Sequence, residues 1–192
     1  MIKKYFLLNA LFVLSMTSYA EPLDPVKLLS SYVGIDTVNP PGNESRAVDF
    51  YAKIFEKEGI EFSSGESAPG RGNIWARIKG GDLPALILLQ HTDVVPATKK
   101  YWDTDPFVAE IKDGYLYGRG VIDMKGAGIS QLVSFIRLHR SGLSLNRDVV
   151  FVATADEEAG GMFGAGWLID NHPEIFEGAG FVINEGGSGQ II

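Results

Sequence analysis

The amino-acid sequence predicts an α/β protein with three layers and a mostly parallel, mixed central sheet. Short apolar runs alternate with segments of helical periodicity, and this alternation is typical of strands joined by crossover helices. The runs 85–89 and 149–153 are continuously apolar, as strands covered on both faces should be. Acidic residues or a histidine follow several runs, and ligands of such sheets bind beyond the carboxyl ends of the strands.

Helices are predicted from capping signals and apolar spacing. The first begins at Asp24-Pro25, where an N-cap acceptor precedes proline. Its predicted buried face consists of Val26, Leu29, Tyr32 and Val33. An apolar stripe over 47–55 predicts a second helix that ends at Gly59. A third helix is predicted from about 126 to 140, and a short one around 167–169.

Three further segments are predicted as strands. They are 60–63, 73–78 and 181–183. Together with the two apolar runs they complete the expected sheet.

The first twenty residues resemble a signal peptide rather than a part of the fold. Lys3 and Lys4 precede an apolar stretch that is too short to span a membrane, and Ser18-Tyr19-Ala20 is a small-x-small cleavage site. We therefore expect a leader at 1–20 and an exported, periplasmic or secreted protein formed by 21–192. The sequence has no cysteine, which excludes disulfides and thiolate metal ligands.

The charge balance limits the possible partners. Without residues 1–20 the chain has 15 basic and 24 acidic residues, a net charge of −9. This charge disfavours nucleic acids and, once the leader is removed, anionic membranes. It is compatible with a small substrate, because bound cations would reverse the local potential.

Four segments carry the residues of a candidate metal site. They are His91-Thr92-Asp93, the glycine-rich loop 118–126 around Asp123, Asp156-Glu157-Glu158 and Asn184-Glu185-Gly186-Gly187. One imidazole with several carboxylates suits a hard or borderline divalent metal, and zinc is the favoured ion.

Two of these segments also allow other interpretations. Asp93 can accept the imidazole N–H of His91 that faces away from a metal, but an isolated histidine can equally be a core residue at a strand end. Glu157 and Glu158 reach one site only if the backbone turns there. One could then ligate while the other takes a proton from water, although three consecutive acids are most often a solvated loop.

The loop around Asp123 resembles a phosphate-binding loop only superficially. Its glycines allow close approach to an ion, but the order of residues that cradles phosphate is absent, which argues against a nucleotide-binding domain. Lys125 is predicted to be a local salt-bridge partner. Arg119 is expected to orient the loop or to pair with a carboxylate.

In their residues and their order along the chain, the four segments resemble the successive signatures of the two-zinc exopeptidases and amidohydrolases. This superfamily includes glutamate carboxypeptidase, acetylornithine deacetylase, succinyl-diaminopimelate desuccinylase and aminoacylase. The resemblance implies two zinc ions per complete active site, with cobalt or manganese as substitutes. It also implies a small peptide or an N-acyl amino acid as substrate, which leaves exopeptidase or carboxypeptidase and deacylase activity open.

The resemblance also implies a role for each site residue. His91, Asp123 and Glu185 would hold one zinc ion, Asp123 would bridge to a second ion, and Glu158 would ligate that ion. Catalysis would depend on Glu157 as general base and on Asp93 as the partner of His91. A cis peptide is implied between Asp123 and Met124.

The chain departs from the superfamily pattern in one respect. Members carry a last histidine ligand far downstream and an inserted lid and dimerisation domain. Neither His139 nor His172 has the context of that ligand. We therefore interpret 21–192 as the amino-terminal part of a catalytic domain, with an incomplete fold, and expect a homodimer only in a full-length protein. The alternative is a truncated, inactive metal-binding or interaction module.

Overall fold

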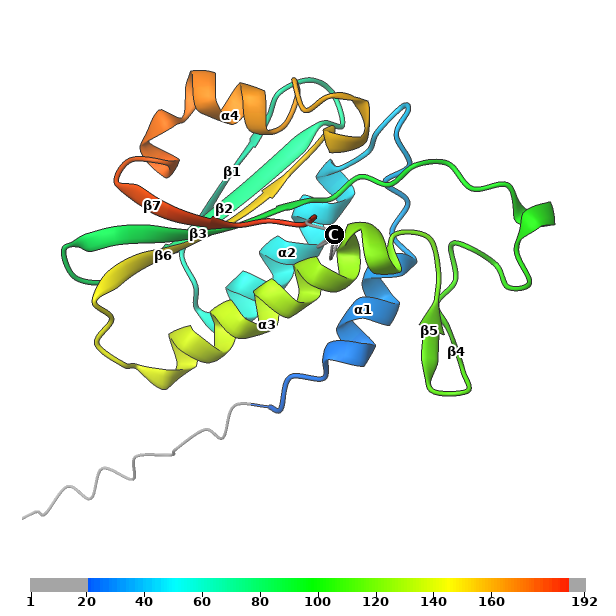
Figure 1. Cartoon of the computed structure of the whole chain (residues 1–192), viewed down its shortest axis with the longest axis horizontal. Helices are drawn as coiled ribbons and strands as arrows, with labels where there is room; N and C mark the ends of the chain where they lie inside the picture. The colour runs from blue at the N-terminus through cyan, green and yellow to red at the C-terminus, as the bar shows by residue number, and fades with distance from the viewer. Residues whose placement is uncertain (1–20, 187–192) are drawn as a thin grey trace, which may run out of the picture.

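A computed structural model describes residues 21–186 and shows a five-stranded sheet in the order β1-β2-β6-β3-β7 (Figure 1). The strands are β1 (Phe62–Glu66), β2 (Gly72–Ile78), β3 (Leu83–His91), β6 (Arg147–Thr154) and β7 (Ala179–Ile183). Strands β6, β3 and β7 are parallel, whereas β2 pairs antiparallel with β1 and with β6. The sheet is mixed, as predicted, and its parallel half contains the strand that ends at His91.

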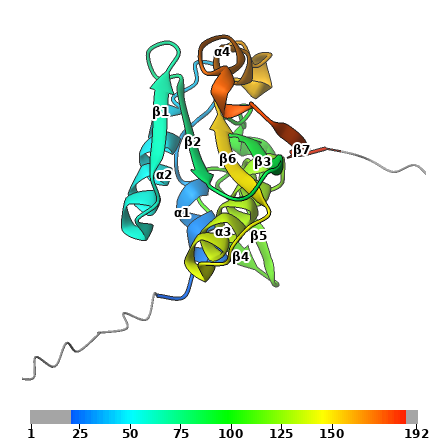
Figure 2. The same cartoon turned by 90° about the vertical axis from the view of Figure 1, so that its left-hand side faces the viewer.

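Helices cover both faces of this sheet, which gives the predicted three layers (Figures 1 and 2). The helices are α1 (Pro25–Val33), α2 (Ser45–Glu58), α3 (Gly126–Ser141) and α4 (Ala165–Asn171). Side chains alternate along β6, so Phe151 joins a core with α1, α2 and α3, while Val150 and Val152 pack with Leu168 of α4.

The start of α3 lies very close to the end of β3. A Cβ atom on Gly128 would lie 1.8 Å from Oε1 of Gln90. Any larger residue would therefore require this buried amide, which accepts the hydroxyl of Tyr51 at 2.8 Å, or the helix itself to move. The contact places the loop that precedes α3 beside His91. The carboxyl ends of β3, β6 and β7 open toward the same region, where the acidic segments follow.

Three details differ from the sequence prediction. Val26 is 50% exposed, because α1 buries mainly Tyr32 and Val33. The first strand begins two residues later than predicted. An unpredicted hairpin of β4 (Glu110–Lys112) and β5 (Tyr115–Tyr117) projects from the body of the molecule (Figure 1).

The predicted leader at 1–20 lies outside the described residues. Within residues 21–186, no helix has both the length and the apolar character needed to cross a membrane.

Candidate metal centre

His91 is the last residue of β3, and its imidazole is 1% exposed. Nδ1 lies 3.0 Å from the main-chain carbonyl oxygen of Asp93 and 3.4 Å from its carboxylate. The carbonyl can only accept, so Nδ1 carries the hydrogen and donates to it. Nε2 then faces the opposite side of the ring, toward the acidic segments.

Three carboxylates surround Nε2 of His91. The closest oxygen atoms belong to Asp123 at 3.0 Å, Glu185 at 3.2 Å and Glu157 at 3.8 Å. These residues come from three different segments, each of which follows a strand or precedes α3. Folding therefore brings together side chains that are far apart in the sequence.

Glu158 also belongs to this cluster. Two overlapping groups have potential ligand atoms that all lie within 4.8 Å of one another: His91 with Asp123 and Glu158, and His91 with Glu157 and Glu185. The structure thus gathers every residue predicted for the site, although its grouping of the acids differs from the predicted ligand set of His91, Asp123 and Glu185.

The loop around Asp123 is anchored by the residue that follows it. The Asp123–Met124 peptide is cis, as the resemblance implies. Met124 is fully buried, and its sulfur accepts the main-chain N–H of His91 at 3.2 Å. The Asp123 side chain remains 59% exposed, so it is open to solvent on the side away from His91.

The two adjacent glutamates face one site because the backbone turns sharply after β6. Asp156 has a φ of 70°, and the glycines at 160 and 161 also have positive φ. The main-chain N–H groups of Glu157 and Glu158 donate to the two carboxylate oxygens of Asp93, each at 3.1 Å. Asp93 therefore anchors this turn, a contact that the sequence analysis did not anticipate.

The pKa values reflect a crowded negative charge. Burial lowers the pKa of His91, but Asp93, Glu185 and Glu157 outweigh it and raise the value to about 9. Burial and neighbouring acids, with Asp123 prominent, raise the pKa values of Glu158 and Glu185. A divalent cation would relieve this repulsion, and one imidazole with several carboxylate oxygens is a donor set that fits zinc.

Two basic residues of the loop differ in their surroundings. The prediction of a salt bridge for Lys125 was wrong: its Nζ donates to the carbonyl oxygens of Tyr32 at 3.0 Å and Ile35 at 2.8 Å. Burial lowers the pKa of Lys125 to about 7. The guanidinium of Arg119 lies over the ring of Trp102, with its central carbon 5.3 Å from the ring centre.

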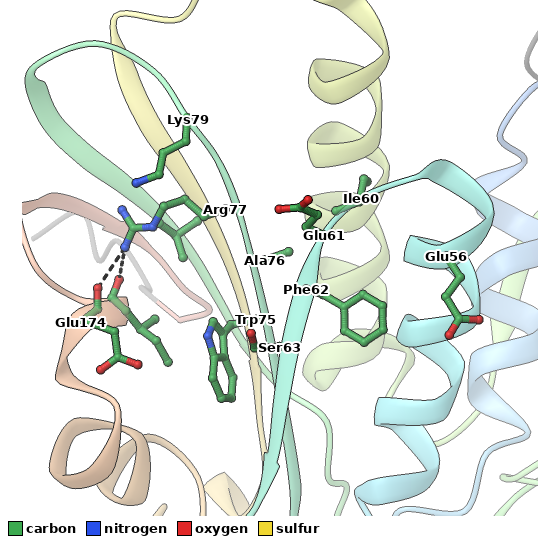
Figure 3. A pocket seen from close by; sticks show the side chains of 12 residues that line it. Glu56, Ile60, Glu61, Phe62, Ser63, Trp75, Ala76, Arg77, Lys79 and Glu174 are labelled. Carbon is green, nitrogen blue, oxygen red and sulfur yellow. Dashed lines mark hydrogen bonds between the residues drawn. The ribbon is translucent and has the colours of Figure 1, made fainter.

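A separate cavity of about 660 Å³ lies away from the metal centre (Figure 3). Its lining includes Val150, in the middle of β6, and Trp75 of the neighbouring strand β2, whereas the candidate metal centre follows the end of β6. Arg77 in this cavity donates to the carbonyl oxygens of Glu174 and Ile175 (Figure 3). The cavity has no histidine in its lining, and none of the candidate metal ligands lines it.

Comparison with known proteins shows which proteins this chain is similar to. The chain is 34% identical to Aminoacylase-1B of Rattus norvegicus over 84% of this chain and 40% of the relative. It is 32% identical to succinyl-diaminopimelate desuccinylase of Ehrlichia canis (strain Jake), over 80% of this chain and 41% of the relative. The crystal structure of human carnosine dipeptidase 1 superimposes with a TM-score of 0.65 at 26% identity, covering 85% of this chain and 38% of that one.

These relatives correct one prediction and identify the family. The expectation of an exported, periplasmic or secreted protein is contradicted, because aminoacylase-1 and succinyl-diaminopimelate desuccinylase are cytosolic enzymes. The chain spans about two fifths of the length of the curated relatives it matches. The model of peptidase family M20/M25/M40 matches residues 87–191, which is more than half of the sequence. The chain therefore belongs to peptidase family M20/M25/M40.

Proposed function

We propose that the protein is a zinc-dependent hydrolase of amide bonds that acts on small peptides or N-acyl amino acids. The observation that carries the proposal is the close approach of carboxylates from three distant segments to Nε2 of His91, at distances of 3.0 to 3.8 Å. Relatives named as an aminoacylase, a desuccinylase and a dipeptidase support the substrate class.

In this proposal the residues of the centre divide into two ligand sets. His91, Asp123 and Glu185 would hold one zinc ion, and Glu158 would hold a second ion that Asp123 bridges. When bound, zinc supplies Lewis-acid chemistry: it polarises a substrate carbonyl and lowers the pKa of water.

Glu157 would serve as the general base. Its carboxylate is 53% exposed, so a substrate and a water molecule can reach it from solvent. Glu157 would take one proton from the attacking water while the water oxygen forms a bond to the carbonyl carbon. The same proton would then pass to the amine nitrogen as the C–N bond breaks, which returns Glu157 to its ionised state. Asp93 would hold Glu157 in place through the main-chain N–H.

We also propose that residues 21–192 form the amino-terminal part of a larger catalytic domain. The coverage of two fifths of the relatives supports this interpretation. The remaining ligand of the second ion and the lid would then come from outside this segment, so the second ion would bind weakly to the segment alone.

Zinc titration and an activity assay test the two parts of the proposal. Calorimetric titration of the chain should show one tightly bound zinc ion and one weaker ion. The full-length protein should release amine from an N-acyl amino acid or a dipeptide. A chelator should abolish this activity, and added zinc should restore it. A chain that binds no zinc, or activity that a chelator does not affect, would contradict the proposal.

A further inference from the structure

Arg71 lies behind the metal centre, immediately before β2, and is 8% exposed. Its Nη2 lies 2.5 Å from Oδ1 of Asp156 and 3.0 Å from Oε1 of Glu44. Its Nη1 donates to the carbonyl oxygen of Pro41 at 3.0 Å and to Oδ1 of Asn39 at 3.4 Å. A planar guanidinium can hold several acceptors in fixed directions at once, which an ammonium group cannot.

Asp156, the partner of Arg71, directly precedes the two glutamates of the centre. Its φ of 70° lies in the left-handed region, so the surrounding contacts must hold it there. Oδ1 accepts from Arg71, and Oδ2 accepts the main-chain N–H of Phe163 at 3.1 Å. The main-chain N–H of Asp156 donates to Glu44 at 3.3 Å. Hydrogen bonds to Arg71, Phe163 and Glu44 therefore hold both the side chain and the backbone of Asp156 in place.

Asn39 connects this cluster to the opposite side of the turn. Its Nδ2 lies 2.7 Å from Oδ2 of Asp93 and 3.3 Å from Oδ1 of Asp156. Asp93 in turn receives the main-chain N–H groups of the two glutamates. The turn is thus held between two carboxylates, one on each side, and Asn39 bridges them.

The balance of buried charge makes Arg71 the central member of the cluster. Glu44, Asp93 and Asp156 are each at most 3% exposed. Arg71 is the basic residue that contacts both Glu44 and Asp156. Without its charge, these two carboxylates would face each other in a buried space, which disfavours the present arrangement of the turn.

We propose that Arg71 is a positioning residue that holds the turn at Asp156 so that Glu157 and Glu158 both face His91. The proposal rests on the function proposed above for these two glutamates, because Arg71 bonds to Asp156 and Glu44 rather than to either of them. Its effect on metal binding is therefore transmitted through the backbone of the turn.

The test compares Arg71→Gln and Arg71→Lys with Arg77→Gln as the matched control. Arg77 lies on β2, the strand that Arg71 directly precedes. Its guanidinium pairs with the carboxylate of Asp148 at 2.9 Å, far from the turn at Asp156. Hydrogen exchange of the metal-free protein reports on amides 156–163, and competition titration reports zinc affinity. Near-ultraviolet circular dichroism checks that each variant is folded.

In Arg71→Gln we expect exchange at 156–163 to accelerate more than tenfold, and zinc affinity to fall by about 10- to 100-fold, the usual effect of losing an outer partner of a metal ligand. Arg71→Lys keeps the charge and should recover part of both losses. Arg77→Gln should change neither by more than about twofold, because distant sites act independently.

Unchanged exchange in Arg71→Gln would overturn the proposal. Accelerated exchange with unchanged zinc affinity would also overturn it, because Arg71 would then stabilise the turn without positioning the glutamates. If Arg71→Gln does not fold, the test uses hydrogen exchange at 156–163 and zinc affinity in Arg71→Lys. Wild-type exchange and wild-type affinity in that variant would refute the inference. A wild-type protein that binds no zinc would refute the proposed function and not the role of Arg71. In that case, hydrogen exchange that accelerates at 156–163 only in the Arg71 variants would still support the inference that Arg71 holds the turn at Asp156.

Discussion

The raised pKa of His91 should make zinc binding strongly dependent on pH. The nearby acids, Asp93 above all, outweigh the effect of burial and raise the pKa to about 9 in the metal-free protein. The ring is therefore protonated at pH 7. Zinc binds only the neutral imidazole, so binding must displace this proton.

The size of the effect follows from the pKa. With a pKa of about 9, the neutral fraction of His91 is about one half at pH 9 and about one hundredth at pH 7. Zinc affinity should therefore fall by about 50-fold between these pH values, or about 2.3 kcal/mol. About one proton should be released for the first zinc ion bound at pH 7. A histidine with the ordinary pKa of about 6.5 would change affinity by less than about twofold over the same range.

Calorimetry in two buffers of different ionisation enthalpy measures the released protons, and competition with a chelator measures affinity across the pH range. Asp93→Asn is an informative control, because it removes the charge that contributes most to raising the pKa of His91. That variant should release fewer protons at pH 7. Zinc affinity that is the same at pH 7 and pH 9, without proton release, would refute the reasoning.

Three substitutions test other parts of the account. Glu157→Gln should retain zinc but reduce amine release by about 10²- to 10⁴-fold, the usual contribution of a general base, as measured by titration and steady-state assay. Asp123→Ala should lose both zinc ions, because Asp123 is the proposed bridge, and elemental analysis after dialysis measures the stoichiometry. Gly128→Ala should lower the free energy of unfolding by about 1–3 kcal/mol in denaturant titration, because its Cβ atom would overlap Gln90.

Each of these substitutions has an outcome that contradicts it. Undiminished hydrolysis by Glu157→Gln would exclude this residue as the base. Wild-type stoichiometry in Asp123→Ala would exclude a bridging role. An unchanged unfolding midpoint in Gly128→Ala would show that the Gln90 side chain or α3 can move to admit the Cβ atom without cost.

Strong periodic patterns made most of the fold predictable from the sequence. The apolar runs of β3 and β6 correspond to strands that are covered on both faces, and the helix at 126–141 was predicted almost to its end. The hairpin of β4 and β5 was missed although Asp113-Gly114 is a hairpin signal; both residues have positive φ. Its strands are short and exposed, so they have no buried alternating pattern.

The clustering of the candidate metal ligands was predictable because these residues lie in recognisable segments at the ends of strands. The cluster behind them was not, because its formation depends on long-range contacts. Arg71 is separated from Asp156 by 85 positions, and Asn39 from Asp93 by 54. No local pattern marks Arg71 as the partner of a buried acid, and only the fold reveals that it lies behind the turn.

Anomalous diffraction at the zinc absorption edge, from crystals of the zinc-loaded protein, tests the central claim most directly. The account predicts a peak about 2.0–2.1 Å from Nε2 of His91 and about 2.0–2.2 Å from an oxygen of Asp123. A zinc peak bound through Nδ1, or zinc found only on surface residues away from His91, would contradict it.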